Sequence, residues 1–470
     1  MTLIASIFIA CLALLNWRYS RSILFPPVVF CLLWASILMG LVLSGDYFYR
    51  LTAVTPFICS LGCLAFSAGA IAFNSLHRAG RFRGWRSRPV SENKLSLRTI
   101  DLLLVVCGCL FPLYWQTLTS IGQRSGAVNM FQAVRTEMVQ GDLGKSVGLG
   151  VYSYLIEFLS VMTLIVATET CRLRLSKWRL GLWITLMLAF CVPTGSRLGL
   201  LIAAFGVLGI FAFVKNRISL LATLSVSIAV LAIFAVPAIT LGKGGSLYAS
   251  SLENIGGVAR SFQVYALGGI VACDQLLQSP PEQPEEARSL HFFYAVAATL
   301  GLHTRVPNQT DVEVLIPWKT NVYSVYYHYL EDFGWTGMCA AFFVLGAAFA
   351  GLHGAAATGR PEAITLLGLG CSYLVFTCAG DPFFWGLSSC IQCIAIVLII
   401  YNVAPLLRVL KLASATRPTV GGGQNRVFHG NITRHYHCEL EHQGGASRMS
   451  TVDRSGPPGG DRSTTSGRGG

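Results

Sequence analysis

The segment Asn321-Val-Tyr-Ser-Val-Tyr-Tyr-His-Tyr-Leu-Glu-Asp-Phe-Gly-Trp-Thr-Gly337 leads into an apolar run that continues to Leu352. Wound as a helix at about 100° per residue, it puts its polar side chains on one arc and its aromatic side chains on the opposite side. The polar arc consists of Asn321, Ser324, His328, Glu331 and Asp332. We predict a helix that packs through its aromatic side and presents a narrow polar face at the entrance of a membrane.

The composition of the whole chain is too apolar for a soluble globular protein. Of its 470 residues, 53% are hydrophobic and 12% are charged, and the mean hydropathy is +0.58. A hydrocarbon core about 30 Å thick needs roughly 20 mainly apolar residues for each helical crossing. We therefore predict an all-α polytopic membrane protein with about eleven transmembrane helices. The predicted spans are residues 2–15, 23–43, 51–73, 102–119, 151–167, 180–194, 198–214, 218–241, 335–352, 363–379 and 383–404.

Lys and Arg in the short connections predict the orientation of these spans, because cytoplasmic loops carry an excess of both. They concentrate in alternate connections, at 18–21, 78–98, 172–179, 215–217 and Arg360. The N-terminus is therefore expected outside and the C-terminus inside. Residues 242–334, between the eighth and ninth spans, become a large outer, periplasmic segment. Within it, residues 291–302 are expected to form a short interfacial helix.

The composition changes after the last span. Residues 413–470 are rich in Gly, Ser, Thr and Arg, so they cannot bury enough apolar surface to fold alone. We predict a polytopic transmembrane domain over 1–412 and a disordered cytoplasmic tail over 413–470. The net charge of +13 lies in the loops and the tail, a distribution that argues against nucleic acid as a partner.

Neither a P-loop nor a Gly-x-Gly-x-x-Gly after a predicted strand occurs in the sequence, which argues against a nucleotide as the energy source. Most of the 15 cysteines lie in apolar runs, where they are expected to pack as small core residues. The pair Cys390-x-x-Cys393 lacks the further ligands that a metal site needs. We expect no cofactor and no metal. A substrate would then arrive already activated, and a lipid-linked phosphate ester is the natural form at a membrane site.

Several basic residues fall on the predicted outer side. Arg197 ends Thr194-Gly-Ser-Arg197, at the junction between two spans. An Arg at this depth either reaches the lipid headgroups or binds an anion, and both interpretations remain open. Its guanidinium matches phosphate oxygens in a bidentate way that Lys cannot. The other basic candidates, each either solvated or part of a clamp around a diphosphate, are Arg135, Arg260, Arg305 and Lys319.

A hydroxyl acceptor needs a general base within hydrogen-bond reach. The candidates are His303, His328, Glu331 and Asp332. His titrates near neutral pH, and a carboxylate in a dry vestibule is tuned toward that range. The alternative interpretation makes Asp332 a helix cap and His328 a packing residue. Glu157, inside a predicted span, is a further candidate because a charge within the membrane is expensive.

Four short motifs resemble one family of membrane enzymes. They are Asn321-Val-Tyr323, Glu331-Asp-Phe-Gly-Trp-Thr-Gly337, Thr194-Gly-Ser-Arg197 at a helix junction, and Arg135 in the preceding outer loop. Together they resemble the Wzy-type O-antigen and exopolysaccharide polymerases, which join oligosaccharide repeat units at the bacterial inner membrane. The resemblance covers roughly residues 1–412, mostly as topology.

The resemblance implies a metal-independent membrane glycosyltransferase with its site at the periplasmic face. It would transfer a growing chain from undecaprenyl diphosphate onto a new lipid-linked repeat unit. By this resemblance Arg135 and Arg197 contact the diphosphate, while Asn321 and Asp332 belong to the rim of the site and Tyr323 to the substrate-binding residues. The implied partners are the undecaprenyl-diphosphate-linked oligosaccharide, membrane lipid, a chain-length regulator (co-polymerase) and a flippase.

Two alternatives remain. An O-antigen ligase uses the same donor with a lipid A core acceptor, and the ligases resemble this chain in having a His in the large outer loop, here His303. A polysaccharide transporter or flippase would favour internal repeats and discontinuous helices near the bilayer midplane. The sequence shows no internal repeat, so the transporter is the weaker alternative.

Overall fold

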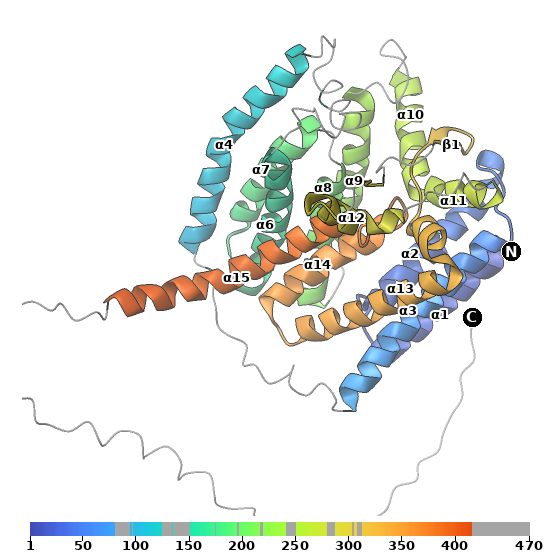
Figure 1. The fold of residues 1–470 in the computed structure, drawn as a ribbon, viewed down its shortest axis with the longest axis horizontal. Coiled ribbons are helices and arrows are strands. Elements are labelled where there is room, and N and C mark those ends of the chain that lie inside the picture. Colours follow the sequence, from blue (N-terminus) through green and yellow to red (C-terminus); the bar gives the residue numbers. More distant parts are fainter. Residues whose placement is uncertain are drawn as a thin grey trace, which may run out of the picture. The chain divides into compact units, whose positions relative to one another are not determined.

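The structure is a computed structural model, drawn in Figure 1. It describes residues 1–79, 95, 97–124, 134, 151–173, 175–194, 197–216, 220–240, 251–279, 287–302, 305–307 and 313–415. Contacts divide the chain into the units Met1–Leu412 and Ala413–Gly470, and the packing described below belongs to the first. The predicted tail, apart from the end of the last helix, lies outside the described residues, as do Arg135 and His303.

A helix lies over each predicted span (Figure 1). The helices are α1 (Thr2–Ser20), α2 (Pro26–Leu43), α3 (Val54–Arg78), α4 (Leu97–Arg124), α6 (Val151–Leu173), α7 (Lys177–Thr194), α8 (Arg197–Lys215), α9 (Leu220–Thr240), α13 (Val325–Ala357), α14 (Pro361–Phe376) and α15 (Leu387–Ala415). Among the described residues, six of these helices, α1 to α4, α6 and α13, are long and apolar enough to cross a membrane. The prediction of an all-α, multi-pass membrane protein is thereby confirmed, while the number of crossings stays a prediction.

Helices α3 and α13, which are far apart in the sequence, pack extensively against each other. At this crossing a Cβ atom on Gly69 would overlap the carbonyl oxygen of Phe343, and a Cβ on Gly346 would overlap that of Phe66. Each helix therefore contributes a glycine that faces the backbone of the other. Small residues let two membrane helices approach this closely, because association in lipid depends on packing and not on the hydrophobic effect.

The aromatic side of the 321–337 segment is buried, as predicted. Tyr326 and Tyr329 are fully covered, and the Tyr326 ring lies 4.6 Å from Trp34 and 5.0 Å from Phe342, centroid to centroid. Edge and tilted contacts at this spacing are favourable beyond the area that they bury. This aromatic cluster joins α2 to α13.

The helix predicted over 321–337 is shorter than expected at both ends. It begins at Val325, whose N–H donates to the Thr377 carbonyl (2.9 Å), and the N–H of Ser324 donates to the Gly269 carbonyl (3.1 Å). It is interrupted at Gly334, which has φ 64° and ψ −169°, a conformation that L side chains rarely adopt. Asn321 and the two residues after it therefore precede the helix, and the apolar half starts afresh after Gly334.

The large segment 242–334 contains regular structure. Its described elements are α10 (Ser251–Gln263), a π-helical turn η3 (Val264–Gly268), α11 (Gly269–Gln278), a 3₁₀ turn η4 (Arg288–Leu290), α12 (His291–Thr299) and the antiparallel pair β1 (Val314–Leu315) and β2 (Lys319–Thr320). The helix predicted at 291–302 is thus present as α12. Helix α11 is buried against α3 and α13, so this part of the segment is wedged between helices.

Asp274 holds α11 in this position. Its buried carboxylate accepts hydrogen bonds from the Thr52 N–H (3.1 Å), the Thr52 hydroxyl (2.6 Å), the Thr55 hydroxyl (2.6 Å) and the Gln278 amide (2.7 Å). Carboxylates are favoured at a helix N-terminus, where the backbone N–H groups have no partner within the helix. Asp274 therefore ties the segment to the start of α3.

The helices alternate in direction, which gives the described unit two ends. We call the first the Tyr323 end, where α13 and α15 begin and α14 ends, and the second the His353 end, where α1, α3, α6, α8 and α13 end and α2 and α14 begin. A cavity opens at the Tyr323 end, and two more at the His353 end.

Candidate functional site

The cavity at the Tyr323 end has a volume of about 520 Å³ and is lined by α12, residues 321–323, the end of α14, the α14–α15 connection and the first turn of α15. Its lining mixes aromatic rings with hydrogen-bonding groups, an arrangement typical of small-molecule sites. The lining residues used below are His291, Asn321, Tyr323, Asp381, Trp385, Ser388 and Ser389. Two of the residues predicted to bind substrate, Asn321 and Tyr323, are thus brought together here.

Asp381 shapes one wall of the cavity. Its carboxylate accepts the Tyr329 hydroxyl (2.9 Å) and the backbone N–H groups of Phe383 (2.9 Å) and Trp385 (3.0 Å). Burial raises the pKa of this carboxyl, and these hydrogen bonds act in the opposite direction. Because the carboxylate is bonded on both oxygens, Asp381 positions the turn that carries Trp385. Sequence reasoning missed it, although an Asp before Pro, as in Gly380-Asp-Pro382, is a signal for a turn.

Glu157 of α6 lies directly behind the cavity wall. The Ser389 hydroxyl, which lines the cavity, donates a 2.6 Å hydrogen bond to Glu157 Oε1. Glu157 Oε2 is buried and has no hydrogen-bond partner among the described residues. The Glu157 carboxylate is therefore linked to the cavity through a single hydroxyl group, that of Ser389. Its second oxygen is a buried acceptor without a donor, which is energetically costly.

The start of α8 packs against the same part of α6. A Cβ atom on Gly199 would lie 3.2 Å from the Ser160 hydroxyl and 3.7 Å from a methyl group of Ile156. These two residues flank Glu157 on α6. Arg197, the first residue of α8, thus begins its helix close to the turn that carries Glu157.

Asp332 serves as an anchor, and the prediction that it lies open as a general base is not supported by its contacts. Its two oxygens accept the backbone N–H groups of Arg288 (2.9 Å) and Ser289 (2.6 Å). It therefore caps the η4 turn, and not the following helix as the sequence suggested. The physical reason is that η4 presents N–H groups with no partner inside so short a turn.

The predicted open polar face is wrong, because its central residue is covered. The His328 side chain is only 1% exposed, with its ring 4.5 Å from Trp385 and 5.4 Å from Tyr327. Glu331 is half-buried and accepts a hydrogen bond from the Tyr327 hydroxyl (2.9 Å). The positive charge of Arg288 interacts electrostatically with both His328 and Glu331. A helical projection of one segment cannot reveal that η4 and the Trp385 turn cover it.

The other predicted basic residues do not line the cavity within the described part of the chain. Arg260 is exposed, with its guanidinium 5.1 Å from the centre of the Trp318 ring. Arg305 and Lys319 are exposed as well. Arg135 and His303 lie outside the described residues, and for Arg197 only the backbone position is described. A residue that sequence reasoning passed over, His291, does line the cavity, with its Nδ1 3.1 Å from the Pro307 carbonyl oxygen.

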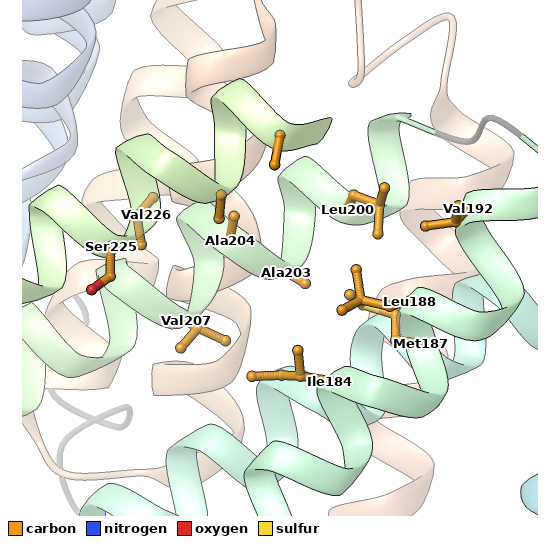
Figure 2. A pocket seen from close by; sticks show the side chains of 12 residues that line it. Ile184, Met187, Leu188, Val192, Leu200, Ala203, Ala204, Val207, Ser225 and Val226 are labelled. Carbon is orange, nitrogen blue, oxygen red and sulfur yellow. The ribbon is translucent and has the colours of Figure 1, made fainter. Parts of the chain in front are cut away.

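A second, apolar cavity of about 370 Å³ lies between α7, α8 and α9. Figure 2 shows Val192 and Leu200 near one end of it and Val207 and Ser225 near the other. Ser225 carries the one hydroxyl among its lining side chains, which are otherwise aliphatic or Met187. Leu200 is one helical turn from Arg197, so this cavity opens beside the start of α8.

Comparison with known protein families, curated proteins and solved structures gives no match for this chain. The chemistry of the cavities therefore has to be inferred from their own residues. No group of three or more His, Cys, Asp or Glu side chains arranged to hold a metal ion occurs in the part of the chain that the structure describes.

Proposed function

We propose that the protein is a membrane glycosyltransferase that polymerises undecaprenyl-diphosphate-linked oligosaccharide repeat units into O-antigen or exopolysaccharide at the periplasmic face of the bacterial inner membrane. The observation that carries the proposal is the cavity at the Tyr323 end, with Glu157 bonded to its wall through Ser389 (2.6 Å). The resemblance of the Asn321 and Arg197 motifs to the Wzy-type polymerases gives the reaction class.

The lining of the cavity suits a sugar. Trp385, which is half-buried, offers a ring surface against which the apolar face of a sugar ring can pack, and Asn321, Ser388 and Ser389 offer donors and acceptors for its hydroxyl groups. Such a combination of a few polar groups with aromatic walls fixes the orientation of a ligand. At about 520 Å³ the cavity is of the size at which small ligands are bound.

The Glu157–Ser389 pair would accept the proton that the reaction releases. As the acceptor hydroxyl attacks the anomeric carbon, a new glycosidic C–O bond forms and the C–O bond to the diphosphate breaks. The acceptor proton passes to the Ser389 oxygen while the Ser389 proton passes to Glu157, so the serine ends neutral. A general base acts through one bridging group when each step is within hydrogen-bond distance.

Undecaprenyl diphosphate leaves with the bonding electrons, and Arg197 would neutralise its growing negative charge. The position of Arg197 at the start of α8, near the turn that carries Glu157, supports this role. The apolar cavity in Figure 2 begins one turn further along α8 and would hold the polyprenyl chain. The diphosphate and the polyprenyl chain of the donor would thus bind to separate surfaces of the protein, one polar and one apolar.

One observation favours the ligase as a second candidate. His291, a histidine of the large segment, lines the cavity, and a histidine in this segment is the feature in which the ligases resemble the chain. His303, the residue predicted for that role, lies outside the described residues.

Deletion of the gene separates these functions. For the polymerase we expect surface polysaccharide reduced to a single capped repeat unit, measured by gel analysis of lipopolysaccharide and mass spectrometry of lipid-linked sugars. Accumulation of long lipid-linked chains that never reach their acceptor would favour the ligase. Repeat units that collect on the cytoplasmic side would instead reject both transferases and favour a flippase.

A further inference from the structure

Two cavities at the His353 end, of about 620 and 550 Å³, have no part in the proposed reaction. The first lies between the ends of α1, α6, α8 and α13, and the second between the ends of α1, α3 and α13. His353 lines both. Its ring is held edge to face by Phe25 (5.4 Å) and Phe213 (5.5 Å), centroid to centroid, so the imidazole is fixed at the boundary between the two cavities.

Three side chains that line the smaller of the two cavities each carry a buried polar atom that the protein leaves unsatisfied. Tyr19 Oη, His77 Nδ1 and His353 Nε2 are all buried and have no hydrogen-bond partner among the described residues, and all three side chains line this cavity. Buried polar atoms are nearly always hydrogen-bonded in native proteins, because leaving one unpaired costs its full desolvation penalty. Three such side chains around one cavity therefore point to an occupant toward which they turn to form these hydrogen bonds.

The charge of both cavities indicates that this occupant is an anion. Arg78 lines the smaller cavity, with its guanidinium 5.0 Å from the centre of the Tyr19 ring, and Arg21 and Arg172 line the larger. No Asp or Glu lines either cavity in the described part of the chain. Glu169 approaches Arg172 from α6 (3.6 Å), so Arg172 is partly neutralised while Arg78 and Arg21 are not paired with a carboxylate among the described ion pairs.

The chemistry of the donors suits a phosphate. Tyrosine, imidazole and guanidinium groups each donate to phosphate oxygens, and guanidinium does so with the strongest geometry. The larger cavity adds apolar side chains, among them Trp17, Leu24 and Ile364, which suit an attached hydrocarbon part. Basic pockets between membrane helices with this mixed lining bind lipid headgroups.

We propose that the two cavities at the His353 end form a binding site for a phosphate group, with Tyr19, His77, Arg78 and His353 as its donors. The ligand is an anionic phospholipid headgroup or a soluble phosphate ester. The site lies at the opposite end of α13 from the cavity of the proposed function, and it does not depend on that function.

The experiment measures lipid binding to the full-length protein in detergent by native mass spectrometry. Phosphatidylglycerol and phosphatidylcholine are added at equal concentration, with and without inorganic phosphate as competitor. The test variant combines Tyr19→Phe and His353→Phe, which removes two of the unsatisfied polar atoms while keeping both rings in place. A second variant, Arg78→Gln, removes the charge. The control is Arg50→Gln, a fully solvated arginine paired with Asp46.

We expect the wild type and Arg50→Gln to prefer phosphatidylglycerol, and each test variant to bind it about tenfold more weakly, the effect of losing one or two charge-assisted hydrogen bonds. Displacement of phosphatidylglycerol by inorganic phosphate would support the phosphate site and assign it to a soluble ester. Equal retention of both lipids without any effect of phosphate would overturn the proposal. So would unchanged phosphatidylglycerol binding by both test variants.

Discussion

Three aspartates hold the irregular parts of this chain in place, each by accepting hydrogen bonds from distant backbone N–H groups or hydroxyls. Asp274 ties α11 to the start of α3, Asp332 ties α13 to η4, and Asp381 ties the α14–α15 connection to α13. Their common role follows from the chemistry of a carboxylate, which accepts several hydrogen bonds at once. These residues build the walls of the site without having to react.

Asp274→Ala should lower the free energy of unfolding by about 3 kcal/mol, because it leaves buried donors without an acceptor. Thermal unfolding in detergent measures the change. The matched control is Asp46→Ala, which removes an ion pair whose partners are both more than 80% exposed at the side chain (87% and 88%), and which should cost less than about 0.5 kcal/mol. Equal shifts for the two variants would contradict the anchoring role of Asp274.

Ser389→Ala and Glu157→Gln should each reduce polymer formation by at least about 100-fold at normal membrane levels, the usual effect of losing a proton acceptor. Ser60→Ala provides the control, because the Ser60 hydroxyl donates only to the Pro56 carbonyl of its own helix in the contacts described (2.9 Å) and does not line the cavity. Polymer length and amount on gels of the complemented deletion strain report the effect. Normal polymer in Ser389→Ala cells would exclude proton transfer through this hydroxyl.

The limits of sequence reasoning about the site are visible in individual residues. Asn321 and Tyr323 were found because they belong to a motif, and both line the cavity. Trp385 and His291 were missed because their role depends on which segments meet, which periodicity cannot report. His328 was expected on an open face for the same reason, since a helical projection contains no information about the turns that cover it.

At the scale of elements, the helices of the predicted spans could be predicted from the sequence because lipid imposes a length and an apolar composition on each of them. Helices α10 and α11 were not, because they pack against other helices and carry no such signature. The break in α13 also escaped prediction. A glycine inside an apolar run is compatible with an unbroken helix, so the sequence does not reveal the positive φ of Gly334.

Gly346→Ala should destabilise the protein by about 1–3 kcal/mol, because the new methyl group overlaps the α3 backbone. Gly354→Ala, in the same helix, should be neutral or stabilising by up to about 1 kcal/mol, since a Cβ there meets no atom within 4 Å. Because only Gly346→Ala is expected to lower the stability, the two variants together test the α3–α13 crossing. Thermal unfolding in detergent is again the measurement, and a drop of equal size in both variants would contradict this packing.

At the scale of the molecule, α14 contributes its end to the Tyr323 cavity and its start to the larger His353 cavity, while residues 321–323, just before α13, line the former and the end of α13 lines both His353 cavities. The two sites therefore face opposite sides of any membrane that these helices cross. The basic connections predicted to be cytoplasmic include those at the His353 end, where Arg21, Arg78 and Arg172 lie. Three of the connections that the sequence predicts to be cytoplasmic thus lie together at one end of the described unit.

Reporter fusions test that orientation. Alkaline phosphatase fused after Thr299 should be active and green fluorescent protein at the same position dark, because this position belongs to the predicted periplasmic segment. After Thr358 the pattern should reverse. Each position thus carries its own control. Reversal of both patterns would place the Tyr323 cavity in the cytoplasm and would reject a periplasmic polymerase.

The hydrogen bond between Asp274 and Thr52 also determines how early in synthesis this part of the fold can be completed. The two residues are separated by 222 positions, so at about 5–20 residues per second the ribosome needs about 10–45 s to reach the second after making the first. During that time the Thr52 N–H and the hydroxyls of Thr52 and Thr55 lack this acceptor. The first three helices must stay together in the membrane until more than half of the chain has been synthesised.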